Sequence, residues 1–143
     1  TEGGLDVASN PVRMQAACQT LADVGIEVSL FIDPDMKQID AAIKAGAPVI
    51  ELHTGCYADA TTVAEQQSEL LRIKDAATYA FNAGLQVNAG HGLHLHNVEA
   101  VCKIPEIVEL NIGHSIIAQA VFSGLEKTVR DLKRVMRDAR AVG

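Results

Sequence analysis

Short apolar runs alternate along the chain with longer segments in which apolar residues recur at helical spacing. The runs predict strands at about 26–32, 48–53, 85–89 and 108–112. The periodic segments predict helices at about 11–24, 35–45, 60–83 and 124–141, with shorter helical pieces near 97–102 and 115–121. Nearly continuous apolar strands are typical of parallel strands that are covered on both faces. The alternation of strand and helix therefore predicts an α/β fold.

The turns between predicted elements support this pattern. Gly25, Gly46 and Gly84 each follow a predicted helix and precede a predicted strand. A glycine in this place adopts the left-handed conformation that closes a helix. Ser123 and Glu126 fit a capping box ahead of the last helix. Such βα units are too few here for a closed eight-stranded barrel, so they predict either a small open sheet or half of a barrel.

Composition narrows the class of protein. The 143 residues are 48% hydrophobic and 21% charged, which is typical of a globular chain. No apolar run approaches the ~20 residues that a membrane-spanning helix needs. The net charge is −6, no basic tract is present, and 3% of residues are aromatic. We therefore expect neither a nucleic acid nor a membrane as partner.

The cysteines bear on the cellular compartment. Cys18, Cys56 and Cys102 lie far apart and form no Cys-x-x-Cys pair. An odd, scattered set of this kind is typical of reduced thiols that pack as small buried hydrophobes. Because no signal peptide is visible either, we expect a cytoplasmic location.

The pattern Asn-x-Gly-His occurs twice, each time at the carboxyl end of a predicted strand, in residues 88–91 and 111–114. That end carries the active site in parallel α/β folds. Glycines let backbone amides approach a ligand, and the start of a helix favours an anion. Gly113-His114-Ser115, directly ahead of a helical stretch, is therefore predicted to hold a phosphate group. The alternative is an ordinary turn with a hydrogen-bonded histidine.

Glu51 lies inside the otherwise apolar run Val49-Ile50-Glu51-Leu52. Burying a carboxylate there is costly unless it is paired or functional. If Glu51 points into a site, burial favours its neutral form and prepares it for proton transfer. The alternative is a glutamate that points outward at the end of a strand.

His91, His94 and His96 form a His-x-x-His-x-His cluster, which raises the question of a metal site. The spacing does not match common zinc motifs, and no carboxylate lies nearby. We favour His91 as an acid or base, because imidazole titrates near neutrality. We expect His94 and His96 to be loop or surface residues, and no metal to be bound. Two alternatives stay open: a metal-dependent TIM-barrel hydrolase that uses this cluster, and a non-catalytic half-barrel that binds phosphate compounds.

Five stretches carry a family resemblance, namely residues 1–7, 28–33, 51–58, 87–93 and 109–114. With them the whole chain resembles the pyridoxine 5′-phosphate synthase family of deoxyxylulose-dependent vitamin B6 biosynthesis. The resemblance implies a (β/α)8 TIM barrel, with residues 1–143 as the carboxyl-terminal half of a single domain that covers about strands five to eight and their helices. Thr1 rather than Met opens the chain. We expect the isolated chain neither to close a barrel nor to catalyse.

The resemblance also implies a chemistry and an assembly. The family condenses 1-deoxy-D-xylulose 5-phosphate with 3-amino-2-oxopropyl phosphate, and releases pyridoxine 5′-phosphate, inorganic phosphate and water. His91 corresponds to a general acid, and Glu51 to a group that stabilises positive charge or relays protons. Gly92, Gly113 and His114 correspond to the site for the phosphate of the amino ketone. The family implies no cofactor and implies homo-oligomers, in the form of octamers.

Overall fold

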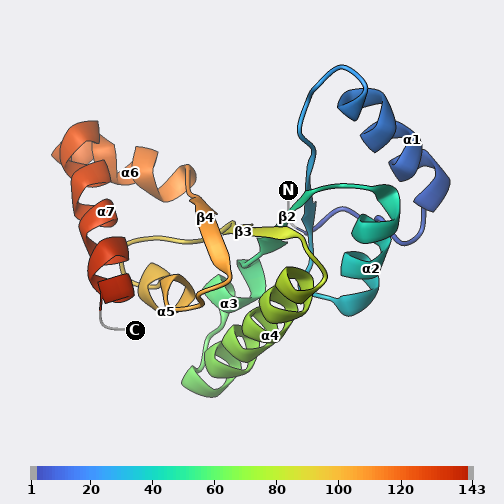
Figure 1. Cartoon of the computed structure of the whole chain (residues 1–143). Coiled ribbons are helices and arrows are strands. Elements are labelled where there is room, and N and C mark those ends of the chain that lie inside the picture. The colour runs from blue at the N-terminus through green and yellow to red at the C-terminus, as the bar shows by residue number, and fades with distance from the viewer. Residues whose placement is uncertain (1–2, 142–143) are drawn as a thin grey trace.

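A four-stranded parallel sheet forms the centre of the molecule (Figure 1). The computed structural model describes residues 3–141. The strand order is β1-β2-β3-β4, so each strand pairs with the next one along the chain. The strands are β1 (Ser29–Ile32), β2 (Val49–His53), β3 (Gln86–Gly90) and β4 (Ile107–Asn111). The predicted α/β class and its parallel sheet are confirmed.

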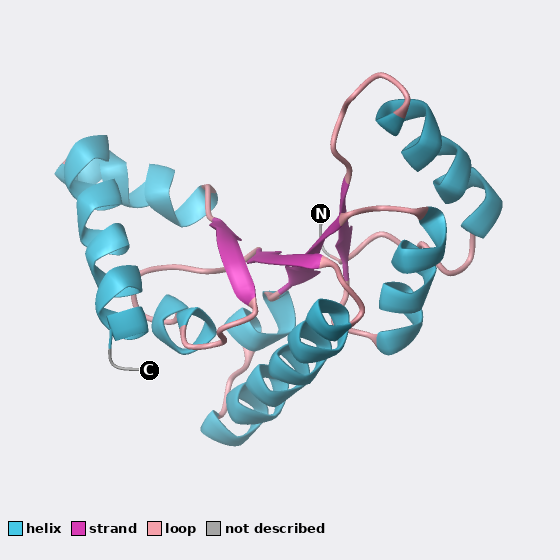
Figure 2. Cartoon of the chain, viewed as in Figure 1, coloured by secondary structure: helices cyan, strands magenta, loops and turns pink. Residues whose placement is uncertain are grey.

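Helices alternate with the strands and lie mainly on one side of the sheet (Figure 2). They are α1 (Pro11–Ala22), α2 (Met36–Ala45), α3 (Gly55–Asp59), α4 (Val63–Asn82), α5 (Val98–Cys102), α6 (His114–Ser123) and α7 (Leu125–Ala141). Helix α1 lies ahead of β1 and is packed against α2. The predicted elements are all present, with ends that move by a few residues. The short α3 is an addition, because the sequence analysis predicts no helix between the strand at 48–53 and the helix at 60–83.

Glycine ends the helices where the sequence places it. Gly25, Gly46 and Gly84 have φ values of 77°, 81° and 90°, which confirms the left-handed conformation. The predicted capping box of the last helix is wrong. Ser123 belongs to α6, where its hydroxyl donates to the carbonyl of Gln119, and it does not cap α7.

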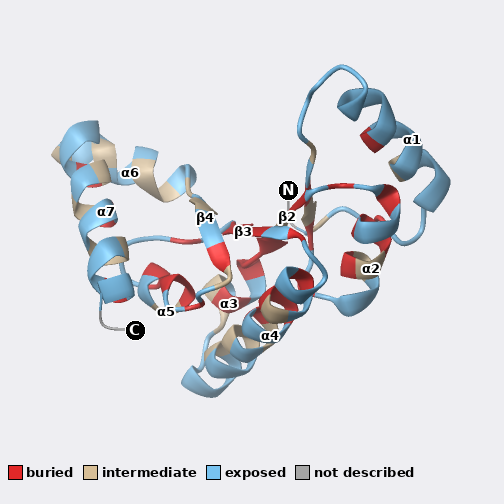
Figure 3. Ribbon diagram, viewed as in Figure 1, coloured by how far each residue is buried: buried red, intermediate tan, exposed pale blue. Residues whose placement is uncertain are grey.

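The hydrophobic core lies between the sheet and the helices (Figure 3). Alternate strand residues point to this side, because successive side chains of a strand face opposite ways. The fully buried side chains here include Ile32, Ile50, Leu52 and Val87 from the strands, with Ile39 and Ile73 from the helices. Each contributes about 1.5–3 kcal/mol through burial. This packing holds the carboxyl ends of the strands at fixed positions.

The other side of the sheet is polar. Phe31, Glu51, Asn88 and Glu109 are partners in register across the four strands, so their side chains share this face. A bulge in β4 leaves Val108 outside the pairing, and this shift brings Glu109 into the row. The Asn88 amide donates to the Glu109 carboxylate over 3.1 Å. This face therefore presents hydrogen-bonding groups where the helix side presents hydrocarbon.

All three cysteines are free thiols, as the sequence predicts. Cys18 and Cys102 are buried, whereas Cys56 is exposed at the start of α3, which corrects the expectation that each is a buried hydrophobe. Within residues 3–141, no helix has the length and apolar character needed to cross a bilayer.

Candidate active site

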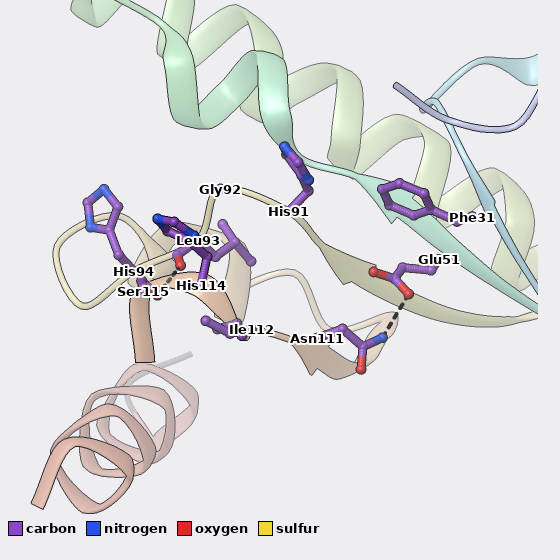
Figure 4. Close-up of a pocket in the computed structure, with 11 residues that line it drawn as sticks. Phe31, Glu51, His91, Gly92, Leu93, His94, Asn111, Ile112, His114 and Ser115 are labelled. Carbon is purple, nitrogen blue, oxygen red and sulfur yellow. Dashed lines mark hydrogen bonds between the residues drawn. The ribbon is translucent and has the colours of Figure 1, made fainter. Parts of the chain in front are cut away.

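One cavity of about 650 Å³ lies at the carboxyl ends of the strands (Figure 4). Glu51, His91, Gly92, Gly113 and His114 all line it. The structure thus brings together the five residues that the sequence selects, from strand β2 and from the segments that follow β3 and β4. Their convergence follows from the parallel sheet, which carries the carboxyl ends of neighbouring strands to one edge. The rest of the lining comes from Phe31, Leu93, His94, Asn111, Ile112 and Ser115.

Glu51 points into this cavity from β2, so the alternative of an outward glutamate is wrong. Its carboxylate accepts a hydrogen bond of 2.9 Å from the Asn111 amide (Figure 4). Partial burial raises the pKa of Glu51 above its ordinary value; the Asn111 hydrogen bond acts against this, and the charge of Glu109 adds to it. The neutral form of Glu51 is therefore more accessible than that of a glutamate in water, which suits a group that passes protons.

Asn111 is a site residue that the sequence argument does not select, although it is the first residue of the second Asn-x-Gly-His. It extends from the end of β4 to hold Glu51 on β2. The asparagine that both repeats share is the signal in the sequence that could have pointed to Asn111. Asn88, the equivalent residue of the first repeat, also holds a carboxylate on the polar face. The asparagines of both repeats therefore position acidic side chains.

His91 follows β3 directly and has an unusual backbone. Its φ of 84° lies in the left-handed region that residues other than glycine rarely adopt. The hydroxyl of buried Thr54 lies 2.5 Å from the His91 carbonyl oxygen and 2.8 Å from that of Gly90, and so holds this turn. Backbone strain maintained by surrounding contacts is common at functional positions. The imidazole is thereby presented at the cavity edge.

The loop after His91 is held in one shape by its own hydrogen bonds. Gly92 has a φ of 70°, and a Cβ there would lie 2.6 Å from the Cβ of Ala58. The buried Asn97 side chain accepts from the His94 amide over 2.7 Å and donates to the Gly92 carbonyl over 3.1 Å. The Tyr57 hydroxyl donates to the Asn97 carbonyl over 2.6 Å. The backbone of Gly92 is therefore fixed at the cavity before any ligand arrives.

The start of α6 forms the other wall of the cavity. The helix begins at His114 after Gly113, and no described side chain caps its first turn. The amides of a first helical turn have no partner within the helix, and they bind anions. The Ser115 hydroxyl donates to the Leu93 carbonyl over 2.7 Å, which joins this helix start to the loop that contains Gly92 (Figure 4). The uncapped start of α6 and the Gly92 backbone thus line the same cavity.

The histidine cluster does not form a metal site in this geometry. Among residues 3–141, no group of three or more histidine, cysteine, aspartate or glutamate side chains is placed to hold a metal ion. His94 and His96 are both exposed, with ring centroids 6.0 Å apart. His94 contributes to the cavity edge, and His96 does not.

Comparisons with known proteins show which family the chain belongs to. Two curated relatives, from Aliivibrio fischeri and from Photobacterium profundum, are named pyridoxine 5′-phosphate synthase. Each is 59% identical to this chain over 140 residues, which is 98% of this chain and 58% of the relative. This chain therefore spans somewhat more than half the length of these relatives.

A solved structure shows the fold. The X-ray crystal structure of the YdjI aldolase from Escherichia coli K12 superposes with a TM-score of 0.55 at 16% identity, over 96% of this chain and 54% of the aldolase. The four strands and their helices are therefore part of a TIM-barrel wall. The sequence profile described as Pyridoxal phosphate biosynthesis protein PdxJ matches residues 1–138. The chain thus belongs to the PdxJ family of pyridoxal phosphate biosynthesis proteins.

Proposed function

We propose that residues 1–143 are the carboxyl-terminal half of a single TIM-barrel domain that acts as a pyridoxine 5′-phosphate synthase. The reaction joins 1-deoxy-D-xylulose 5-phosphate to 3-amino-2-oxopropyl phosphate, and yields pyridoxine 5′-phosphate, inorganic phosphate and water. The observation that carries the proposal is the meeting of Glu51, His91 and His114 at one cavity beside two glycine turns. The proposal uses no metal and no organic cofactor.

The phosphate of the amino ketone is assigned to the start of α6. Within residues 3–141, apart from the chain neighbours of Gly113, no atom lies within 4 Å of a Cβ built on it, so a ligand approaches the backbone there without obstruction. Free amides of the first helical turn and the adjacent His114 imidazole then donate hydrogen bonds to the phosphate oxygens. Gly92 adds backbone contact from the facing loop. Fixing the phosphate at this place orients the amine and ketone carbons toward the other catalytic groups.

Proton transfer is assigned to His91 and Glu51. Imine formation, dehydration and ring closure each require that a proton be moved at a defined atom. His91 donates a proton to the departing hydroxyl or phosphate oxygen. Glu51 stabilises positive charge that develops at nitrogen, or it relays protons, with its carboxylate held by Asn111. General acid–base groups of this kind contribute about 10²–10⁴-fold in rate.

The assembly is proposed to be a cytoplasmic homo-octamer. Three apolar side chains on α6, Ile117, Val121 and Phe122, are 62%, 79% and 87% exposed. Neighbouring apolar side chains left in water favour contact with another protein surface. Native mass spectrometry of the complete protein tests this, since eight copies support the proposal and a monomer contradicts it.

Activity is best tested in a fusion that restores a full barrel. The part of the A. fischeri relative that precedes the matched segment is placed ahead of residue 1, and we call this fusion the reconstituted enzyme. We expect it to form pyridoxine 5′-phosphate from the two substrates, as followed by chromatography. We expect residues 1–143 alone to be inactive, because four strands leave the barrel open.

The variant His91→Asn tests the role of His91 in the same protein. We expect its kcat to fall by about 10²–10⁴-fold while its melting temperature is unchanged. A folded reconstituted enzyme that forms no product contradicts the proposed function. Normal turnover by His91→Asn removes this residue from the chemistry.

A further inference from the structure

A second imidazole, His53, lies behind His91. His53 is the last residue of β2, on the same face of the strand as Glu51, and its side chain is only 5% exposed. Its ring centroid is 4.7 Å from that of His91, with the two planes inclined by 34°. Phe31 packs its ring edgewise on His53 at 5.2 Å. His53 is therefore the buried member of a ring stack, and His91 is the outer member, which borders the cavity.

The two ring nitrogens of His53 have different surroundings. Nδ1 lies 3.5 Å from the Asp33 carboxylate, whereas Nε2 is buried and has no hydrogen-bond partner among the described residues. A carboxylate beside Nδ1 favours the tautomer that carries its proton there. The unpartnered Nε2 then carries no proton and can only accept a hydrogen bond, as one nitrogen of every neutral imidazole does. A buried polar atom left without a partner is rare and requires an explanation.

The chain around the two rings is shaped to bring them together. A Cβ at Gly55 would lie 2.4 Å from Cε1 of His53 and 3.2 Å from Cδ2 of His91, so only glycine leaves room for both rings. The Thr54 hydroxyl holds the left-handed backbone of His91 in place. Three consecutive residues, 53–55, therefore determine where the His91 imidazole lies.

The surroundings of His53 lower its pKa and so favour the neutral ring. Burial is the main cause that lowers the pKa of His53, and the neighbouring His91 and the guanidinium of Arg72 lower it further. The carboxylates of Asp33 and Asp59 act in the opposite direction. Two positive charges at the separation of these rings repel each other strongly. A neutral His53 therefore places no second positive charge against the ring of His91.

We propose that His53 is a positioning residue, whose flat uncharged ring fixes the plane of the His91 imidazole for proton donation. This inference rests on the proposed function. His53 itself touches no substrate, because it is buried and does not line the cavity. Its removal should therefore impair the chemical step and leave phosphate binding intact.

The experiment compares two replacements in the reconstituted enzyme. His53→Phe keeps a flat ring for stacking, whereas His53→Leu fills similar space without one. We expect His53→Leu to lower kcat by at least about 10-fold with KM changed less than about 2-fold, and His53→Phe to recover most of this loss. The matched control is His96→Leu, an exposed histidine outside the cavity, for which we expect normal kinetics.

A further variant covers the case in which His53→Leu does not fold. Gly55→Ala introduces a methyl group that separates the rings without changing either of them. We expect it also to lower kcat and to spare KM. The inference is overturned if folded His53→Leu or Gly55→Ala retains normal kcat, or if the Phe and Leu variants lose activity equally. An inactive unmodified fusion is a different result, because it contradicts the proposed function itself.

Discussion

Gly90 offers a direct test of where the Glu51 carboxylate lies. Gly90 has strand rather than left-handed backbone, so alanine causes no conformational strain there. A Cβ at this position would lie 2.2 Å from Oε1 of Glu51 and 2.8 Å from the Asn111 carbonyl oxygen. Real Cβ atoms do not approach other atoms so closely, so the Glu51 side chain has to move. Its hydrogen bond of 2.9 Å with Asn111 is then lost or distorted.

Stabilising and destabilising effects together determine how much Gly90→Ala changes the free energy of unfolding. Replacing glycine by alanine at a compatible position stabilises a protein by about 0.4–1 kcal/mol, because the unfolded chain loses freedom. Overpacking costs about 1–3 kcal/mol, and a lost hydrogen bond to a charged group costs about 1.5–3 kcal/mol. The destabilisation from the clash and the lost hydrogen bond therefore exceeds the gain from alanine, and we expect Gly90→Ala to lower the free energy of unfolding by about 2–4 kcal/mol. We also expect kcat to fall, because Glu51 leaves the place from which it acts.

Urea unfolding of the reconstituted enzyme, together with steady-state kinetics, measures both effects. Gly3→Ala is the matched control, since no described residue other than its chain neighbours lies within 4 Å of a Cβ at that position. Glu51→Asp shortens the carboxylate, so in the double variant with Gly90→Ala it should relieve part of the clash and give a measurable coupling energy. If Gly90→Ala is as stable and active as the control, the Glu51 carboxylate does not lie against Gly90 and the description of the site is wrong.

Three further predictions concern the same site. Because the folded-state pKa of Glu51 is raised, its ionisation lowers the free energy of unfolding at neutral pH. In urea unfolding, Glu51→Gln should therefore be more stable than the unmodified protein at neutral pH, and this advantage should disappear below the ordinary pKa of 4.5. Steady-state kinetics should show a lower kcat for the same variant. Asn97→Ala removes both hydrogen bonds that close the Gly92 loop, and should cost about 1–3 kcal/mol in unfolding free energy and raise KM; an unchanged KM would contradict the assigned role of the loop. Ser115→Ala breaks the bond to the Leu93 carbonyl, and should weaken binding of inorganic phosphate by about 5-fold in calorimetry, whereas equal affinity would show that the two loops are fixed by other contacts.

Local signals in the chain were enough to predict the elements and much of the candidate site. Apolar runs of strand length and the glycines after each helix are such signals, and they predicted the α/β order that the structure confirms. Glu51 stood out because a carboxylate in an apolar strand is costly to bury without a role. His91 and His114 stood out because Asn-x-Gly-His occurs twice at the carboxyl end of a predicted strand, where active sites of parallel α/β folds lie. Parallel pairing then required these residues to share one edge, which made their convergence predictable.

The partners of these residues, in contrast, come from long-range packing. Asn111 reaches Glu51 across 60 positions of sequence, and His53 meets His91 through a ring contact that no spacing in the chain reveals. Ser123 fitted a capping box in the sequence, yet α6 extends through it and leaves Gly124 as the break before α7. The difference arises because periodicity and helix signals act over a few residues. Side-chain contacts between strands depend instead on register, on the bulge in β4 and on the left-handed turn at His91, which packing of the whole sheet determines.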